Sequence, residues 1–418
     1  MKTRAVVLAA LVWLASSIVF TSFLSADAQS GRVVPTPTPT PATPEASEFK
    51  PKFVVDSSAD KYQLVFSTLF EGILYKKKLY PVAGPLAYDS FIERLNNAGG
   101  RGYRLTSATR SGGIVALVKL DTVQYEYAWF ATGSDLRWVT KGFEGSYSEL
   151  SKHGLRVVDH AVMKYDCPTN ADDYLNGETC DIEDLYLLER KKGVEELTQH
   201  RVIGSAPGWR GNRSAELTAQ VNEKSPQGFY PSMVLSKFEV LLEQGKQDDP
   251  LAGKQDVQLV TSSQWHDDMK KKANALAKQG YRIAFTGRET AVMYRDSATA
   301  SPASYVWLEA RKTDFENQLA NLQEQGALYR TTYPSKSGHE DQLVFEKDAV
   351  DDGKRREYKV LKFEFQDVPD FEKKQVHLDL DPSSRETMKL LNRLVNEGFT
   401  VRDLFFSNEV SVLLERPR

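Results

Sequence analysis

The six histidines of this chain are the first candidates for chemistry, because imidazole serves both as a general base and as a metal ligand. They stand at positions 153, 160, 200, 266, 339 and 377, too far apart to form a cluster in the sequence. His153 precedes a glycine that is expected to end a helix, where a positive charge would suit the helix dipole. No phosphate-binding glycine loop, nucleophile elbow or His-Glu-x-x-His pair accompanies them. The sequence therefore predicts no catalytic residue, no cofactor and no metal ligand.

Two short segments combine histidine with carboxylates, and each has a structural and a metal-binding interpretation. Trp265–Asp268 stands where a helix is expected to begin, and its two aspartates would cap that helix or face its positive end. His377-Leu378-Asp379-Leu380-Asp381 alternates, so that three polar side chains share one face of a strand. That face would need further carboxylates to hold a divalent ion. We favour the structural interpretation of both segments.

The two cysteines, Cys167 and Cys180, flank a loop between two strand-like runs, 157–163 and 185–188. A closed zinc site needs four ligands, so two cysteines alone favour a disulfide. Such a bond would stabilise the fold by roughly 3 kcal/mol through loop entropy, and disulfides are typical of exported proteins. The loop is also rich in acidic residues, but their spacing does not fit an EF-hand calcium loop. A solvated loop is the simpler interpretation.

Six glycines mark the elements that would position these groups. Each glycine follows a segment with helical periodicity and precedes a strand-like run, and a glycine at this place adopts the left-handed conformation that ends a helix. Apolar residues eleven, seven and four positions before each glycine would share one helix face, with departures at Lys224 and Thr387. The structural helix-cap glycines are Gly102, Gly154, Gly228, Gly280, Gly326 and Gly398.

Strand-like runs on both sides of each helix complete a β-α-β-β unit. We predict an α+β fold of about six tandem βαββ modules, each a small, mainly antiparallel sheet with one covering helix. The modules are expected to pair or stack, because the core of one alone is marginal. Their predicted bounds are 53–121, 122–194, 195–250, 251–298, 299–350 and 351–418. Five longer connections are candidates for binding loops: 67–87, 131–141, the cysteine loop, 204–213 and 366–382.

The last of these units has a distinctive set of segments: the helix end Leu391-Asn392-Arg393-Leu394-Val395-Asn396-Glu397-Gly398-Phe399, the opening strand Tyr358-Lys359-Val360-Leu361 and the ending Leu413-Leu414-Glu415-Arg416. With these segments the unit resembles small bacterial domains of unknown function. The pattern recurs with drift over most of residues 60–418. It implies a tyrosine-rich first strand, a helix that ends in glycine and an aromatic residue, and a closing hairpin. It implies no activity, because those domains have none assigned.

The first 28 residues predict export. Lys2 and Arg4 precede an apolar run from Ala5 to Leu24, and Ala26-Asp27-Ala28 offers the small residues that signal peptidase accepts. Serine and threonine dilute the run, which favours a cleaved signal peptide (1–28) and a secreted or periplasmic protein. The alternative is an uncleaved membrane anchor. Residues 29–52 follow as a disordered spacer, because alternating prolines keep the backbone extended.

Charge and repetition narrow the class of function. The 54 basic and 57 acidic residues give a net charge of −3, which predicts no nucleic-acid partner. Membrane contact is expected only if the N-terminal helix is retained. Repetition without a catalytic constellation predicts a protein-interaction or structural role in the cell envelope or exterior, with another envelope or extracellular protein as the partner. The alternatives are a small-ligand or glycan-binding protein and, third, an enzyme with a site between modules.

Overall fold

A computed structural model describes residues 59–418, except 76, 83–84, 109–114, 134–138, 166–180, 195–198, 205–212, 237–238, 245–250, 252–255, 262–265, 288–289, 296–300, 334–340, 349–354 and 408. Six α-helices and 22 strands alternate along the described residues. All strand pairs are antiparallel, and the sheets have three or four strands each. The α+β class predicted from the sequence is confirmed.

Six of the sheets have three strands, and in each the third strand lies between the first and the second. The third strand is therefore the central one, and the first and second strands are edges. We number these sheets 1 to 6 in chain order. Sheet 1 comprises β1 (Tyr62–Phe66), β4 (Tyr103–Ala108) and β5 (Val115–Leu120); sheet 2 comprises β6 (Tyr125–Gly133), β7 (Arg156–Tyr165) and β8 (Asp181–Lys191); and sheet 3 comprises β9 (His200–Gly204), β10 (Phe229–Ser236) and β11 (Glu239–Gln244). Sheet 4 comprises β12 (Val257–Thr261), β13 (Tyr281–Gly287) and β14 (Thr290–Arg295); sheet 5 comprises β15 (Ala303–Glu309), β16 (Leu328–Tyr333) and β17 (Gln342–Asp348); and sheet 6 comprises β18 (Arg356–Phe363), β21 (Thr400–Phe406) and β22 (Val410–Pro417).

One α-helix lies between the first and second strands of each of these sheets in the sequence. Its apolar face is buried against strands, as Phe91 and Leu95 show in the first helix and Leu391 and Leu394 in the last. The third helix departs from the apolar pattern at Lys224, where it passes into a 3₁₀ turn, Ser225–Gln227. The helices are α2 (Pro85–Gly100), α3 (Val139–Ser151), α5 (Arg213–Lys224), α6 (His266–Ala277), α7 (Phe315–Glu324) and α8 (Pro382–Asn396).

The six glycines singled out in the sequence share a backbone conformation, with φ between +69° and +95°. At Gly398, where φ is +95°, an added Cβ would make only an ordinary contact, 3.9 Å from Arg416 Cδ, so the backbone conformation is the reason that glycine is favoured. Four residues after each glycine, one residue of the second strand bulges out of register with the third strand. The bulged residues are Thr106, Val158, Ser232, Ala284, Arg330 and Arg402.

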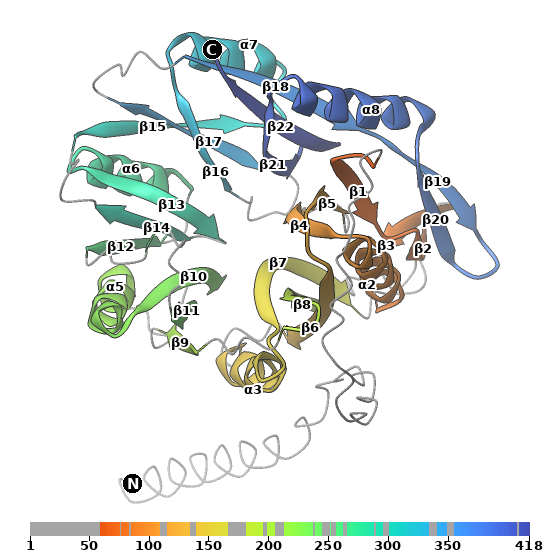
Figure 1. Ribbon diagram of the computed structural model, residues 1–418, viewed down its shortest axis with the longest axis horizontal. Coiled ribbons are helices and arrows are strands. Elements are labelled where there is room, and N and C mark those ends of the chain that lie inside the picture. The colour runs from red at the N-terminus through yellow and green to blue at the C-terminus, as the bar shows by residue number, and fades with distance from the viewer. Residues whose placement is uncertain are drawn as a thin grey trace, which may run out of the picture. The chain divides into compact units, whose positions relative to one another are not determined.

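Neighbouring sheets follow one another around a closed circuit (Figure 1). Each helix contacts the first strand of the next sheet, so that α2 meets β6, α3 meets β9, α5 meets β12, α6 meets β15 and α7 meets β18. The last helix, α8, contacts β1 and closes the circuit. The second strands also meet on the inner side, where β10 contacts β13, β13 contacts β16, β16 contacts β21 and β21 contacts β4.

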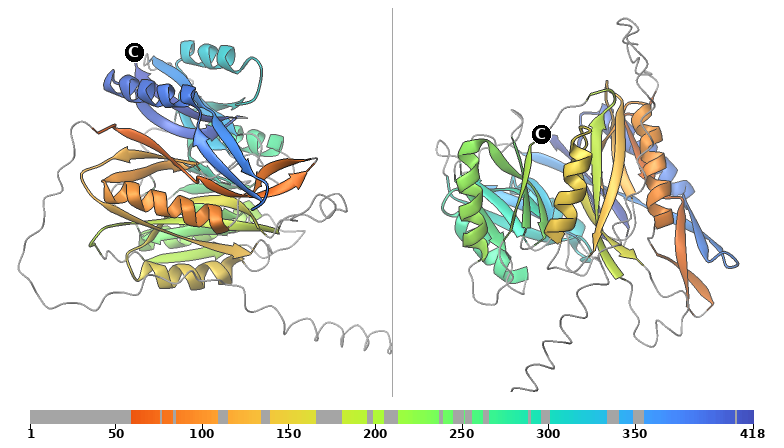
Figure 2. Two further views of the ribbon diagram at one scale, coloured as in Figure 1. Left: turned by 90° about the vertical axis from the view of Figure 1, so that its right-hand side faces the viewer. Right: turned by 90° about the horizontal axis from the view of Figure 1, so that it is seen from below.

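A seventh sheet joins the first and last parts of the described chain. Its four strands, in the order β19-β20-β2-β3, come from two hairpins. The hairpin sheet thus comprises β2 (Leu69–Tyr75), β3 (Lys78–Val82), β19 (Phe365–Asp370) and β20 (Gln375–Leu380). The prediction of loops at 67–87 and 366–382 is wrong, because these segments pair with each other across about 300 residues, Leu69 with His377 and Glu71 with Gln375. The hairpin β19–β20 extends beyond the neighbouring sheets (Figure 2).

The six three-stranded sheets fall within the six predicted ranges, 53–121 to 351–418. Cys167 and Cys180 lie outside the described residues, as do the predicted signal peptide and the proline-rich spacer. Between residues 59 and 418, as far as they are described, no helix has the length and apolar character needed to cross a membrane.

Candidate functional site

The polar contacts between neighbouring sheets are concentrated in seams, where one sheet and its helix meet the first strand of the next sheet. In four seams, one helix asparagine pairs with both backbone groups of a single strand residue. Its Oδ1 accepts the backbone N–H and its Nδ2 donates to the C=O, at 2.6 to 3.3 Å. These pairs are Asn96 with Tyr127, Asn222 with Val257, Asn274 with Tyr305 and Asn392 with Tyr62. The first strand is an edge of its sheet, so one side of its backbone has no neighbouring strand to bond to. The asparagine side chain supplies these hydrogen bonds instead.

The remaining two seams use other side chains at this place. Gln323 Oε1 accepts the Tyr358 N–H at 2.9 Å, and Ser148 Oγ lies 3.3 Å from His200 Nε2. The four asparagines all stand six residues before a helix-ending glycine. This spacing is the signal by which the sequence could have revealed them, but only Asn392 was noticed, as part of a family-like pattern.

Tyrosine hydroxyl groups form a second kind of contact across the seams. The hydroxyl oxygens of Tyr127, Tyr305 and Tyr358 accept the backbone N–H of Leu105, Ile283 and Tyr329 in the preceding sheet, at 2.7 to 3.0 Å. Each of these N–H groups lies three residues after a helix-ending glycine, next to the bulge. The second strands are edges of their sheets, and alternate N–H groups of an edge strand point away from the third strand. The tyrosine hydroxyl therefore satisfies a backbone donor on the free side of the second strand.

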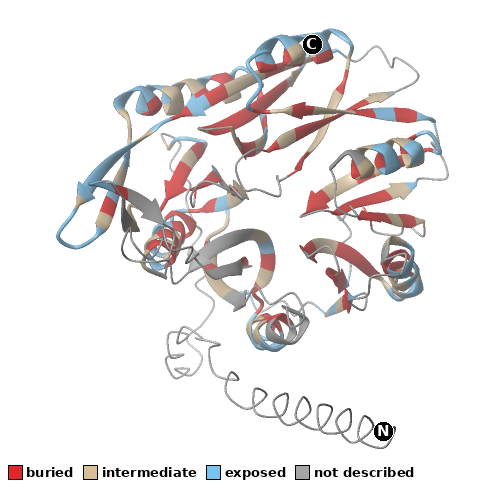
Figure 3. Cartoon of the chain, turned by 180° about the vertical axis from the view of Figure 1, so that it is seen from behind, coloured by how far each residue is buried: buried red, intermediate tan, exposed pale blue. Residues whose placement is uncertain are grey.

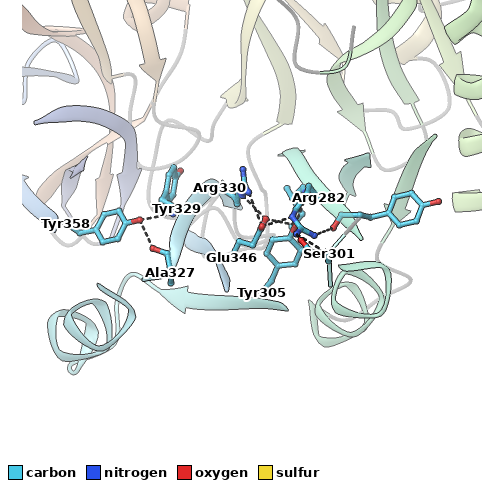
Figure 4. A network of polar contacts seen from close by, with 10 residues as sticks. Arg282, Ser301, Tyr305, Ala327, Tyr329, Arg330, Glu346 and Tyr358 are labelled. Atoms are coloured by element: carbon cyan, nitrogen blue, oxygen red, sulfur yellow. Dashed lines mark hydrogen bonds and ion pairs between the residues drawn. The ribbon is translucent and has the colours of Figure 1, made fainter. Parts of the chain in front are cut away.

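A buried glutamate marks the seam between sheets 4 and 5. Glu346 is 1% exposed and accepts from Arg282 Nε at 2.7 Å and from Arg330 Nε and Nη2 at 2.7 and 3.0 Å. Tyr305 Oη donates to the same carboxylate at 3.2 Å. Figure 4 shows the two guanidinium groups reaching Glu346 from two sides. Since Arg282 belongs to β13 and Arg330 to β16, one carboxylate holds two sheets together.

Three further glutamates on central strands have arginine partners, and each is 3% to 6% exposed. Two of them join consecutive sheets: Arg104 Nε lies 2.9 Å from Glu189, and Arg156 Nη2 lies 2.7 Å from Glu243. The third, Glu415, accepts two hydrogen bonds at 2.9 Å from the guanidinium of Arg402 within sheet 6. A buried carboxylate held by guanidinium is a structural group. We therefore assign these glutamates to sheet packing.

Glu189 is a seam carboxylate whose pKa is raised above its ordinary value. Burial raises its pKa, although Arg104 and the Tyr127 hydroxyl act in the opposite direction. Burial also raises the pKa of Tyr127, and the neighbouring Glu189 charge adds to this effect. The Tyr127 hydroxyl therefore remains protonated and donates to Glu189 at 3.1 Å.

We expect Glu189→Gln to flatten the dependence of stability on pH. The folded-state pKa of Glu189 is raised, so its favourable contribution is complete below the unfolded pKa of about 4.3 and is lost as pH rises through the folded pKa. Between pH 4 and pH 7, the free energy of unfolding should fall further for the unaltered chain than for the variant. Urea titrations at several pH values measure both curves. Parallel curves would show that Glu189 does not contribute.

The segments considered for metal binding have structural partners. Asp379 pairs with Arg385 at 2.5 Å, and the Asp381 carboxylate accepts the Ser383 N–H at 2.8 Å, as a cap on α8. Asp268 pairs with Lys272 at 2.7 Å within α6. In the part of the chain that the structure describes, no three His, Cys, Asp or Glu side chains are grouped to hold a metal ion.

Exposed apolar side chains mark a different region, the hairpin β19–β20. Val368 in β19 is 59% exposed and Phe371 at the turn is 52% exposed; among the large hydrophobic residues described as exposed, these two have the highest fractions. Most of this hairpin is coloured as exposed in Figure 3. Its base is anchored by Phe365, whose ring centroid lies 5.0 Å from that of Phe66, and nearer the turn Val376 is buried and pairs with Phe70 of β2. The hairpin is thus a fixed projection with an apolar tip.

Comparison of the chain with protein-family models found no match, and comparisons with curated proteins and with solved structures found none either.

Proposed function

We propose that this chain is an exported repeat protein of six βαββ modules closed into a ring, and that it binds another protein of the cell envelope or exterior through the β19–β20 hairpin. The exposure of Val368 and Phe371 on a projecting hairpin carries the proposal. Apolar side chains gathered at a projecting edge favour a protein partner, because burying them releases ordered water.

The seams support the ring of modules. The bulge lies at the same distance from each of the six glycines, and the asparagine clamp recurs in four seams, including the one that joins α8 to β1. A closed array leaves no terminal module with an exposed face. Buried ion pairs such as Glu346 with Arg282 join neighbouring sheets, so the ring acts as a rigid support and the hairpin as the contact element.

The test is a pull-down from host envelope extract with the chain from residue 29 onward. We expect one protein to be recovered in fixed ratio, and to be lost when Val368 and Phe371 are both changed to serine. Val194→Ser is the matched control, since Val194 is 43% exposed outside the hairpin. Recovery of no protein, or equal recovery with the double variant, would contradict the proposal. Small-ligand and glycan binding would then be the next class to examine.

A further inference from the structure

The outer edge of β19 has backbone groups that no other strand of the hairpin sheet uses. β19 is the first strand in the order β19-β20-β2-β3, so one of its sides pairs with β20 and the other with no described strand. Asp381 N–H donates to Glu364 C=O at 3.1 Å, which places Glu364 among the residues that bond to the β20 side. Backbone groups alternate between the two sides in an antiparallel pair. The N–H and C=O of Phe365 and Asp367 therefore point outward.

Proline defines how much of this edge can accept a strand. Pro369 continues the outward-facing series of Phe365 and Asp367, and it has no N–H. A proline at such a position prevents an added strand from accepting a hydrogen bond there. The usable edge is therefore the first half of β19, with the outward N–H groups of Phe365 and Asp367 and the C=O groups of residues 365, 367 and 369.

The side chains of β19 alternate between two faces, with Phe365, Asp367 and Pro369 on one and Gln366, Val368 and Asp370 on the other. Asp367 shares its face with Phe365 and has no ion-pair partner among the residues described. Partial burial raises the pKa of Asp367, as expected of a carboxyl group without a cation nearby. Val368 lies on the opposite face, and Phe371 follows at the turn.

The charge of the hairpin favours a basic strand over a second copy of β19 as the partner at the β19 edge. Residues 364–381 contain six acidic residues and two lysines. One lysine, Lys373, is paired with Asp370 at 3.5 Å. A second copy of β19 at this edge would place acidic side chains beside Asp367, which is unfavourable for directly opposed strands. A strand with basic side chains on that face would instead supply the missing cation.

We propose that the β19 edge binds an extended segment of the partner protein by strand addition, and that this segment alternates basic and apolar residues. The basic side chains would face Asp367, and the apolar ones would pack on Val368. Main-chain hydrogen bonds to residues 365 and 367 provide affinity, and the alternate side chains provide specificity. This inference rests on the proposed function and names the chemistry of the partner.

Two eight-residue peptides test the inference on the full exported chain: an acetylated, amidated peptide with four Lys-Val repeats and its Glu-Val counterpart. We expect the Lys-Val peptide to bind at least tenfold more tightly and to slow hydrogen exchange at the Phe365 and Asp367 amides. Asp367→Asn should weaken it about threefold to fivefold, the size of one cross-strand charge pair. Asp367→Pro, which removes the outward N–H without breaking the pairing to β20, should abolish the protection at Phe365.

Equal binding of both peptides, or binding without protection of Phe365 and Asp367, would overturn strand addition of a basic segment. The pull-down separates this result from the proposed function. If Asp367→Pro recovers the envelope partner as well as the unaltered chain does, the partner binds elsewhere and only the edge inference fails. If the Lys-Val peptide protects the edge but no envelope protein is recovered, the edge inference holds and the proposed function fails.

Discussion

Replacing Glu346 by alanine is expected to lower the free energy of unfolding by about 3–5 kcal/mol. The carboxylate is 1% exposed and accepts hydrogen bonds from Arg282, Arg330 and Tyr305. Its removal leaves two guanidinium groups in a largely buried seam without their counterion. Breaking a buried ion pair from one side costs more than the pair contributes, because the remaining charge is desolvated and unpaired. Urea unfolding followed by circular dichroism measures the change.

A surface pair is the matched control for Glu346. Glu386 pairs with Lys389 at 2.7 Å, but both side chains are at least 70% exposed, so Glu386→Ala should change stability by less than about 0.5 kcal/mol. A triple variant with methionine at Arg282, Arg330 and Glu346 should recover most of the loss, because apolar groups of similar volume replace the whole network. A loss below 1 kcal/mol for Glu346→Ala would contradict the assignment of this carboxylate to the seam.

The parts of the fold that the sequence predicts are those set by local chemistry. Helix α8 ends before Gly398 because the backbone at Gly398 has a positive φ. Glycine is favoured in that conformation, so the end of the helix can be recognised from the sequence. The apolar stripe before it, such as Leu391 and Leu394, is buried for the same local reason: residues three and four apart share a helix face. These two signals were sufficient to predict the α+β class.

The hairpin sheet was missed because, apart from the alternation at 377–381, its hairpins contain residues that are unfavourable in strands. β2 contains Gly72, and β19 contains Pro369 and two aspartates, all of which are unfavourable inside a strand. These strands form because β20 pairs with β2, a partner about 300 residues away in the sequence. Such a pairing forms only when distant parts of the chain come together, so no local sequence pattern predicts it.

The seam residues were missed for a different reason. In β17, Glu346 follows the apolar run Leu343–Phe345 and precedes Lys347 and Asp348, a position that suggests the solvated end of a strand. In the fold it is 1% exposed and paired with Arg282 of β13. Helix asparagines likewise have an ordinary surface interpretation. Their regular distance from the glycines would have identified the four as a set, since in these four seams the side chain that bonds the neighbouring strand stands at the same helix position.

Asn392→Ala is expected to destabilise the fold by about 2–4 kcal/mol, and its effect reports on closure of the ring. Asn392 is 7% exposed, and its amide pairs with both the N–H and the C=O of Tyr62, at 2.9 and 3.1 Å. Alanine removes both partners from a buried strand edge, and each backbone group left unsatisfied costs about 1–3 kcal/mol. Thermal and urea unfolding measure the loss.

Asn396→Ala on the same helix is the control, because Asn396 is exposed, and it should change stability by less than about 0.5 kcal/mol. Hydrogen exchange then distinguishes closure from general weakening. If Asn392 closes the ring, its loss should speed exchange first at the Tyr62 amide and in β1, while the amides clamped by Asn96 and Asn274 keep their protection. Uniform acceleration across all the seams would show that Asn392 supports the fold as a whole and has no special part in joining its two ends.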